Sequence, residues 1–154
     1  MTQKKNTFTG EFLYSIDLKG RVNIPAKFRQ VLSDDNEQTF VVTRGIDPCV
    51  WVYPITVWQG IEDELKKLSS LSAVNRTFIR QTARHATITT YDKQGRIQIP
   101  TTLIKYAGLD KEVLIIGMIN KIEIWNPDRL RVVDEQNLGI DPSAYDELAN
   151  KIII

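Results

Sequence analysis

The sequence has very few of the residues that form disulfides, metal sites or membrane spans. Cys49 is the single cysteine among 154 residues, so no disulfide can form within the chain, as is typical of a reducing cytoplasm. No apolar run approaches the roughly 20 residues that cross a bilayer. Residues 1–6 are not followed by the apolar segment of a signal peptide. We therefore expect a cytoplasmic protein that does not contact a membrane.

The motifs of enzymes are missing as well. The sequence contains no Gly-x-Ser-x-Gly, no phosphate-binding loop, no Rossmann glycine pattern and no cluster of histidine and cysteine. His85 is the single histidine, which leaves no histidine pair for metal binding and favours a structural role. Cys49 is compatible with either a reactive or an inert thiol. We expect no catalytic activity, no cofactor, no metal and no small-molecule ligand.

The net charge of +1 conceals an uneven distribution. Lysine and arginine gather in residues 1–29 and 76–105, whereas the remaining residues are acidic in sum. A solvated surface of mixed charge would account for this pattern. A local positive field that attracts a phosphate backbone would account for it too.

An internal repeat organises the chain. The nine residues at 17–25, DLKGRVNIP, recur at 92–100 as DKQGRIQIP. Both copies share Asp, Gly, Arg, a β-branched residue, Ile and Pro. The likeness continues more loosely through residues 40–54 and 113–127. We therefore predict two copies of one unit that runs strand, turn, strand, short helix, strand, turn, strand.

Each repeat contains a turn followed by a return strand. Asp17 and Asp92 open these turns, because an aspartate side chain can bond to its own downstream backbone. Gly20 and Gly95 close them, because glycine tolerates positive φ. Residues 21–24 then alternate polar and apolar side chains, which predicts that the strand returns as a local hairpin.

The segment between the repeats is predicted to be helical. An apolar stripe at intervals of four, four and three residues indicates an amphipathic helix and consists of Val57, Ile61, Leu65 and Leu68. Residues 69–72 predict a break. A second helix is expected over 73–84, with Val74 and Phe78 directed inward.

Three arginines stand at four-residue spacing on the second of these helices, namely Arg76, Arg80 and Arg84. They resemble a stripe for DNA, but no aromatic residue or turn accompanies them. We interpret them as a solvated face or as partners for acidic residues of another subunit, such as Glu62 or Glu64.

The end of the chain carries a helix and a tail. Asn126 and Pro127 are a favourable cap and first residue for a helix over 128–136. The tail, 137–154, is acidic and ends in the three isoleucines 152–154. It is expected either to be mobile or to dock on a neighbouring subunit.

The repeats resemble the MraZ family of bacterial transcription factors. The resemblance is carried by four segments and covers about residues 8–136, the segments being 8–12, 17–25, 91–100 and 106–109. One Asp-x-x-x-Arg would carry no weight, but two copies, each closed by Gly-Arg and by a β-branched residue, X, Ile and Pro, form a specific pattern.

The resemblance implies an α+β fold. Two tandem swapped-hairpin β-barrel units, related to AbrB-type DNA-binding domains, would be arranged around a pseudo-twofold axis with helices between them. The first unit would span residues 8–54, the connecting helices 55–84, the second unit 85–136 and the C-terminal tail 137–154.

The resemblance also implies a function. It indicates a sequence-specific DNA-binding regulator, mainly a repressor, of the division and cell-wall gene cluster. The protein would bind direct repeats in double-stranded promoter DNA as a ring-like homo-oligomer of eight or twelve subunits, in association with the nucleoid. The alternatives are an AbrB-like antitoxin or global regulator, against which the doubled unit argues, and a ring-forming scaffold that does not bind DNA.

Arg21 and Arg96 are the principal candidates for DNA contact. Each follows the turn glycine, where its planar guanidinium could reach a guanine edge or a phosphate. The alternative is that each bonds to the aspartate of its own turn, Asp17 or Asp92, and stiffens the loop. The two roles are compatible, since a partly paired arginine can still be held in position for DNA.

Four further basic residues are candidates for contact with the DNA backbone. Lys19 and Lys93 lie in the turns and would bind phosphates, although plain surface solubility would also explain them. Lys27 and Arg29 follow the first repeat, where the second has Thr102 and Ile104. We therefore expect the first loop to be the more basic of the two.

Overall fold

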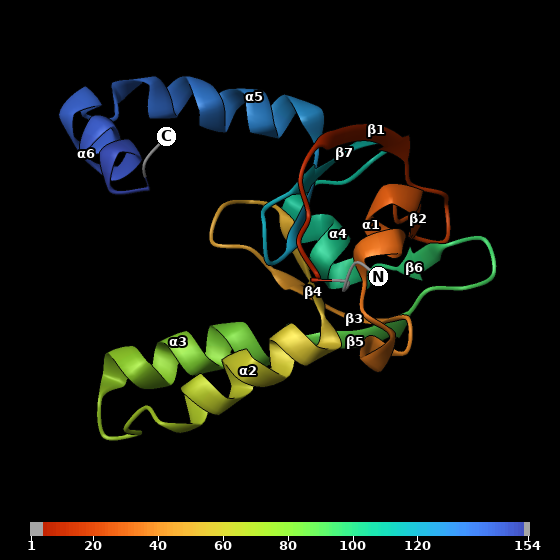
Figure 1. The fold of residues 1–154 in the computed structure, drawn as a ribbon, viewed down its shortest axis with the longest axis horizontal. Helices are drawn as coiled ribbons and strands as arrows, with labels where there is room; N and C mark the ends of the chain where they lie inside the picture. The colour runs from red at the N-terminus through yellow and green to blue at the C-terminus, as the bar shows by residue number, and fades with distance from the viewer. Residues whose placement is uncertain (1–4, 153–154) are drawn as a thin grey trace.

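The computed structural model describes residues 5–152 and consists of α-helices and antiparallel β-strands (Figure 1). The strands are β1 (Glu11–Ser15), β2 (Arg21–Asn23), β3 (Thr39–Arg44), β4 (Val50–Pro54), β5 (Thr87–Thr90), β6 (Arg96–Gln98), β7 (Glu112–Gly117) and β8 (Ile122–Trp125). The helices are α1 (Ala26–Val31), α2 (Ile55–Lys66), α3 (Ala73–Ala83), α4 (Thr101–Ala107), α5 (Pro127–Gln136) and α6 (Pro142–Ile152), with short 3-10 turns η1 (Asp34–Asn36) and η2 (Asn137–Gly139).

The two repeats exchange strands rather than folding separately. Six strands form one sheet in the order β1-β7-β8-β4-β3-β5, and β2 pairs with β6 in a separate ribbon. The first strand of each repeat thus pairs with the other repeat, β1 with β7 and β5 with β3. This exchange buries both repeats together, since the few short strands of one repeat could not cover their own apolar face.

The strands on either side of the first turn were predicted to pair as a local hairpin, and this prediction was wrong. Between β1 and β2 the structure has one isolated bridge, Ile16 to Val22, in place of a ladder. The hairpins later in each repeat are confirmed, because β3 pairs with β4 and β7 pairs with β8 in antiparallel register. The alternating pattern of residues 21–24 therefore marked a strand correctly but not its partner.

One hydrophobic core lies between the sheet and the ribbon. Val22 and Ile97, the central residues of β2 and β6, are each 1% exposed and lie directly opposite each other. Phe8 meets Phe28 of α1 edge to face, with 5.4 Å between ring centroids. Because residues of both repeats fill the same core, the position of the ribbon is fixed by both.

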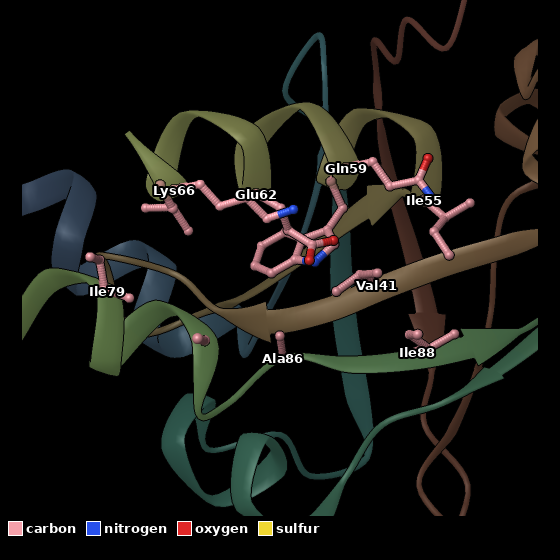
Figure 2. Close-up of a pocket in the computed structure, with 11 residues that line it drawn as sticks. Val41, Ile55, Gln59, Glu62, Lys66, Ile79, Ala86 and Ile88 are labelled. Carbon is pink, nitrogen blue, oxygen red and sulfur yellow. The ribbon is translucent and has the colours of Figure 1, made fainter. Parts of the chain in front are cut away.

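Helices α2 and α3 form an arm beside the sheet (Figure 1). Both helices and the break between them agree with the sequence prediction, and the Ser72 hydroxyl caps α3 by accepting from the Asn75 amide. The inward orientation of Val74 was wrong, since its side chain is 78% exposed, whereas Phe78 is 51% exposed and still lines a pocket against β3, β4 and α2. The helix is rotated so that Ile79 faces α2 and the sheet instead (Figure 2).

A second arm contains α5 and α6. Asn126 caps α5 as predicted, with its side-chain oxygen accepting from the amides of Asp128 and Arg129, and Pro127 is the first helical residue. The tail contains α6, a helix that the sequence analysis did not predict. Ile153 and Ile154 lie outside the described residues. Over residues 5–152, no helix combines the length and apolar character needed to cross a membrane.

Candidate nucleic-acid interface

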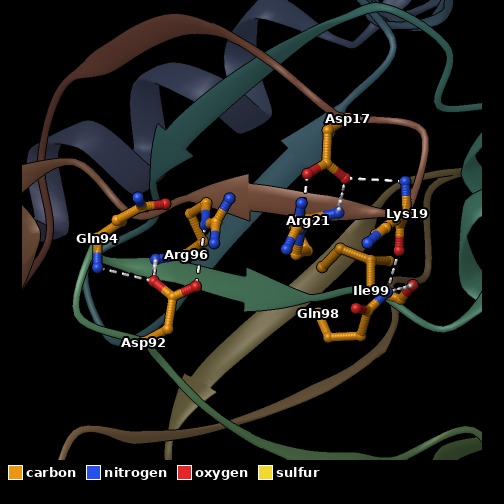
Figure 3. A network of polar contacts seen from close by, with 8 residues as sticks. All are labelled: Asp17, Lys19, Arg21, Asp92, Gln94, Arg96, Gln98 and Ile99. Carbon is orange, nitrogen blue, oxygen red and sulfur yellow. Dashed lines mark hydrogen bonds and ion pairs between the residues drawn. The ribbon is translucent and has the colours of Figure 1, made fainter.

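The first turn is held together by one aspartate. The Oδ1 atom of Asp17 accepts hydrogen bonds from the amides of Lys19 and Arg21, at 2.9 and 2.8 Å. Its Oδ2 atom accepts from Nε of Arg21 at 2.7 Å (Figure 3). Gly20, with φ of +78°, donates its amide to the Asp17 carbonyl and lets the chain turn back. Asp17, Gly20 and Arg21 therefore each have a geometric function in this turn.

The second turn repeats this geometry. Asp92 accepts from the amides of Gln94 and Arg96 at 2.9 and 3.0 Å, and from Nε of Arg96 at 2.9 Å. Gly95 has φ of +80°. The sequence repeat is thus a structural repeat down to individual hydrogen bonds.

Both aspartates remain ionised well into the acid range. The amide of Arg21 lowers the pKa of Asp17, and its guanidinium adds to that effect. The amide and guanidinium of Arg96 lower the pKa of Asp92 in the same way. Hydrogen bonds to a carboxylate stabilise its charged form, so each turn holds an anion beside its arginine at neutral pH.

Both arginines keep donors for another partner. Each bonds to its aspartate through Nε, and among residues 5–152 no protein group accepts a hydrogen bond from the Nη atoms of Arg21 or Arg96. Their side chains are 32% and 25% exposed. The turn-stiffening role is therefore present, and it leaves the outer edge of each guanidinium open.

The two arginines share one face of the β2–β6 ribbon. Arg21 lies opposite Gln98 and Asn23 lies opposite Arg96, while Val22 between them is buried. Side chains alternate along a strand, so all four polar residues project from the same side, away from the core. Figure 3 draws three of them, Arg21, Arg96 and Gln98. The ribbon is a two-stranded polar surface with a turn at each end.

Each turn is bonded to the strand of the other repeat. Asn23 donates through Nδ2 to the Gln94 carbonyl at 2.8 Å. In the reverse direction, Gln98 donates through Nε2 to the Lys19 carbonyl. Asn23 and Gln98 occupy equivalent positions of the two repeats, and the sequence analysis assigned them no role. The positional match between the repeats was the available signal.

The lysines in the turns are exposed but not equivalent. Lys93 follows Asp92 directly, at the position where the first turn has Leu18, and Lys19 stands one residue further on. Both lysines are exposed, and Leu18 is fully exposed at the tip of its turn. The two loops therefore present different charge patterns on the same backbone.

Arg29 lies against the second turn rather than the first. A Cβ atom built on Gly95 would come within 2.7 Å of Cζ of Arg29, which also lies 5.9 Å from the ring centroid of Tyr91. Ile104, its counterpart in the second repeat, covers Gly20 in the same crossed manner. Because the strands are exchanged, Arg29 of the first repeat packs on the turn of the second repeat, and Ile104 packs on the turn of the first. Arg29 therefore does not make the first loop the more basic one. Lys27 is exposed and lies near Gly10 instead.

The arginine row on α3 lies on the other arm. Arg76 donates to the carbonyls of Ser70 and Leu71, at 2.8 and 3.2 Å. Within the described part of the chain, no ion pair joins the row to Glu62 or Glu64, and Glu64 pairs with Lys67.

Cys49 is an inert thiol in this fold. It is completely buried, and burial and the neighbouring Glu123 carboxylate raise its pKa far above the ordinary value. A thiol that stays protonated is a poor nucleophile. Among the described residues, no three acidic, histidine or cysteine side chains come together in a way that would hold a metal ion.

Comparison with known proteins matches both repeats to one family. The family model described as "MraZ protein, putative antitoxin-like" matches residues 7–81 and again residues 82–137. A protein of Halothermothrix orenii named transcriptional regulator MraZ is 48% identical over 122 residues, which cover 79% of this chain and 82% of the relative. Proteins of the same name from Alkaliphilus metalliredigens and Pediococcus pentosaceus are 42% and 41% identical over 146 residues each, covering at least 94% of this chain and 96% of the relative.

Two of these relatives span nearly the whole chain, and both predicted repeats fall within the residues that the family model matches. Their shared name is that of a regulator, which agrees with the expectation that the chain is not an enzyme. The duplicated Asp-x-x-Gly-Arg turn and the matches over both repeats lead to one assignment: the chain belongs to the MraZ family of transcriptional regulators.

Proposed function

We propose that the protein binds double-stranded DNA through the polar face of the β2–β6 ribbon. The observation that carries this proposal is the pair of equivalent turns, in which Asp17 and Asp92 hold Arg21 and Arg96 by Nε on one face and leave their Nη atoms open. A two-stranded ribbon fits the major groove of B-DNA. Arginine is the side chain that most often reads guanine there.

The basic residues would contact different parts of the DNA. Arg21 and Arg96 contact guanine edges or the phosphates beside them. Lys19 and Lys93, at the exposed turns, contact phosphates and add affinity without sequence information. Lys27 also binds backbone phosphate, whereas Arg29 supports the second turn at Gly95 as well as adding positive charge.

The remaining elements of the proposal follow the family assignment. The two exchanged repeats, 8–54 and 85–136, act as swapped-hairpin barrel units around one pseudo-twofold axis, linked by 55–84 and followed by the tail 137–154. Several chains form a ring of eight or twelve copies that presents many ribbons to direct repeats in a promoter. One ribbon binds weakly, and the ring multiplies this through effective concentration. The protein acts mainly as a repressor of division and cell-wall genes on the nucleoid.

The test compares Arg21→Ala with a matched control. Arg131→Ala removes an exposed arginine from α5, outside the ribbon, where it forms an ion pair with Asp128. Gel shifts on DNA with several repeats, selected from a random library, are run at a stated salt concentration with mass controls for assembly. We expect Arg21→Ala to lose binding and Arg131→Ala to retain it. Equal binding by both variants would rule out the proposed interface, and no salt-dependent binding by the wild type would favour a scaffold.

A further inference from the structure

Helix α6 presents an apolar stripe that is left exposed by the residues described, 5–152. Tyr145, Leu148 and Ile152 recur at three- and four-residue spacing and are 70%, 61% and 64% exposed. Every residue of the helix is exposed except Ala149, which lies on the same stripe and is half-buried. A helix of 11 residues is marginal in water without tertiary packing. The stripe therefore indicates a docking face.

A groove of matching character lies on the other arm. It has a volume of about 510 Å³ and runs between α2, α3 and the edge strand β5 (Figure 2). Its apolar wall consists of Val41, Trp58, Leu65, Ile79, Ala83 and Ile88. Ile88, on the last strand of the sheet, is 66% exposed. An open apolar groove of this kind accepts the apolar face of an amphipathic helix.

The charges on the two surfaces are complementary. On α3, Arg76 and Arg80 precede the groove residues Ile79 and Ala83 by three positions, so the arginines border the groove. Arg80 forms no ion pair or hydrogen bond through its side chain with any residue from 5 to 152. Glu62 and Lys66 both line the opposite wall on α2. That wall therefore carries one charge of each sign, and the arginines make the rim of the groove positive in sum.

The polar residues of α6 match this arrangement. Asp146 and Lys151 flank the apolar stripe on opposite sides, because the angular step of a helix is 100° per residue. With the stripe in the groove, Asp146 can face the arginine row while Lys151 faces Glu62. Mixed charges on both rims thus favour α6 over an arbitrary apolar helix.

We propose that α6 of one copy docks in the groove between α2, α3 and β5 of a second copy. Figure 1 shows the arm of α5 and α6 extending separately from the arm of α2 and α3, so the chain does not seat α6 in its own groove. The arginine row then pairs with α6 of a neighbour rather than with Glu62 or Glu64. The proposal deepens, and rests on, the ring of the proposed function.

This contact joins two different surfaces of the chain. A contact between unlike surfaces is heterologous, so each copy uses its helix on one neighbour and its groove on another. Repetition of such a contact closes into a ring where the rotation between copies allows it. The acidic tail thereby becomes the element that assembles the ribbons on one face.

Two point variants of the full chain test the contact, each with a matched control. Leu148→Glu places a charge in the stripe of α6, and Asn150→Glu places the same charge on its polar face. Ile88→Glu places a charge in the groove, and Thr87→Glu places one on the neighbouring, exposed position of β5. Circular dichroism and thermal unfolding of each monomer verify the fold.

Mass in solution, from sedimentation velocity and native mass spectrometry, is the first readout. Leu148→Glu and Ile88→Glu are expected to weaken assembly at least about 30-fold, as for loss of a buried anchor, while both controls assemble like the wild type. An equimolar mixture of the two defective variants should form dimers with one copy of each, because one retains a good groove and the other a good helix. Wild-type-like assembly of either variant, a monomeric wild type or the absence of mixed dimers would overturn the proposal.

Two further readouts separate this contact from other assemblies and from DNA binding. Amide exchange of α6 should be slow in the wild type and fast in Ile88→Glu, although Ile88 does not touch α6 within the chain. If assembly follows these expectations and Arg21→Ala still binds DNA, the contact stands and the DNA interface falls. If Leu148→Glu assembles normally and Arg21→Ala loses DNA, the contact falls and the DNA interface stands.

Discussion

Asn23, on the strand of the first repeat, donates its side-chain Nδ2 to the backbone carbonyl of Gln94 in the turn of the second repeat, at 2.8 Å. In the same way, Gln98 on the strand of the second repeat donates its side-chain Nε2 to the backbone carbonyl of Lys19 in the turn of the first repeat. Each arginine-bearing turn is therefore held by the other repeat. The exchanged strands make the two turns a single rigid unit.

The first prediction concerns this crossed support. Asn23→Ala should lower the free energy of unfolding by about 1 kcal/mol, the net contribution of one hydrogen bond. It should also weaken DNA binding, because the turn that positions Arg96 loses an anchor. Urea unfolding and gel shifts measure the two effects. Asn150→Ala, on exposed α6, is the control, and an equal effect of both substitutions would deny Asn23 a special role.

The second prediction compares the turn glycines. Gly20→Ala and Gly95→Ala both force alanine to positive φ, which costs about 1–2 kcal/mol. A Cβ at Gly20 would also meet the Ile99 carbonyl oxygen at 2.9 Å, whereas at Gly95 the nearest atoms belong to the flexible end of Arg29. We expect Gly20→Ala to be the more destabilising in urea unfolding. Equal losses of unfolding free energy would mean that the Ile99 backbone shifts as easily as the end of the Arg29 side chain.

The Gly95 site offers an internal check. Gly95→Ala should lower the free energy of unfolding both through a clash with Arg29 and through its positive φ. Arg29→Ala should remove the first contribution and leave the second. The double variant is therefore expected to lose less free energy of unfolding than the two single variants lose in sum. Simple additivity would show that Arg29 does not obstruct this position.

The third prediction concerns acid. The pKa of Asp17 and of Asp92 is lower in the folded chain than the ordinary value of 3.8. A lowered folded pKa stabilises the fold above the unfolded pKa, and this stabilisation disappears as the pH falls through the folded pKa. Asp17→Asn should therefore have a lower urea midpoint than the wild type at pH 7. The two midpoints should converge as the pH falls through the lowered folded pKa of Asp17, and a difference that stays constant with pH would contradict the ionic role.

The fourth prediction concerns a buried carboxylate between the two repeats. Glu123 is 7% exposed and accepts from the indole nitrogens of Trp51 and Trp125, at 2.9 and 2.8 Å. Glu123→Leu would strip two indole donors of their acceptor, which costs about 1–3 kcal/mol for each buried group left unpaired. Thermal unfolding measures the loss. Glu112→Leu, on the exposed start of β7, should change stability by less than about 0.5 kcal/mol.

The fifth prediction concerns Cys49. Because it is buried and its pKa is raised, iodoacetamide at pH 8 should label the native chain far more slowly than the chain in urea. Mass spectrometry follows the labelling. Rapid labelling of the native chain would mean that Gly45 and its loop open readily in solution.

Local chemistry made several elements predictable. Asp17 and Gly20 define a turn by their own side-chain and backbone properties, and Asn126 with Pro127 defines the start of α5. The inward face of α3 was only partly predicted, because Val74 is apolar but 78% exposed, while Phe78 is half-exposed in a pocket that β3, β4 and α2 also line. Helical periodicity predicts an apolar face but not the element that packs against it. Helix α3 lies in an arm with few neighbours, so part of its apolar surface stays exposed.

The repeat, the two turns, the arginine beside each aspartate and the family could all be predicted from the residues, because these depend on short-range geometry and on residue identity. The folded chain was needed to show that the first strands cross between repeats, that Arg29 supports Gly95 rather than Gly20, and that Asn23 and Gln98 hold opposite turns. Strand partners are chosen by burial of a shared core. That choice depends on the whole chain, so no local pattern around Arg21 or Arg96 encodes it.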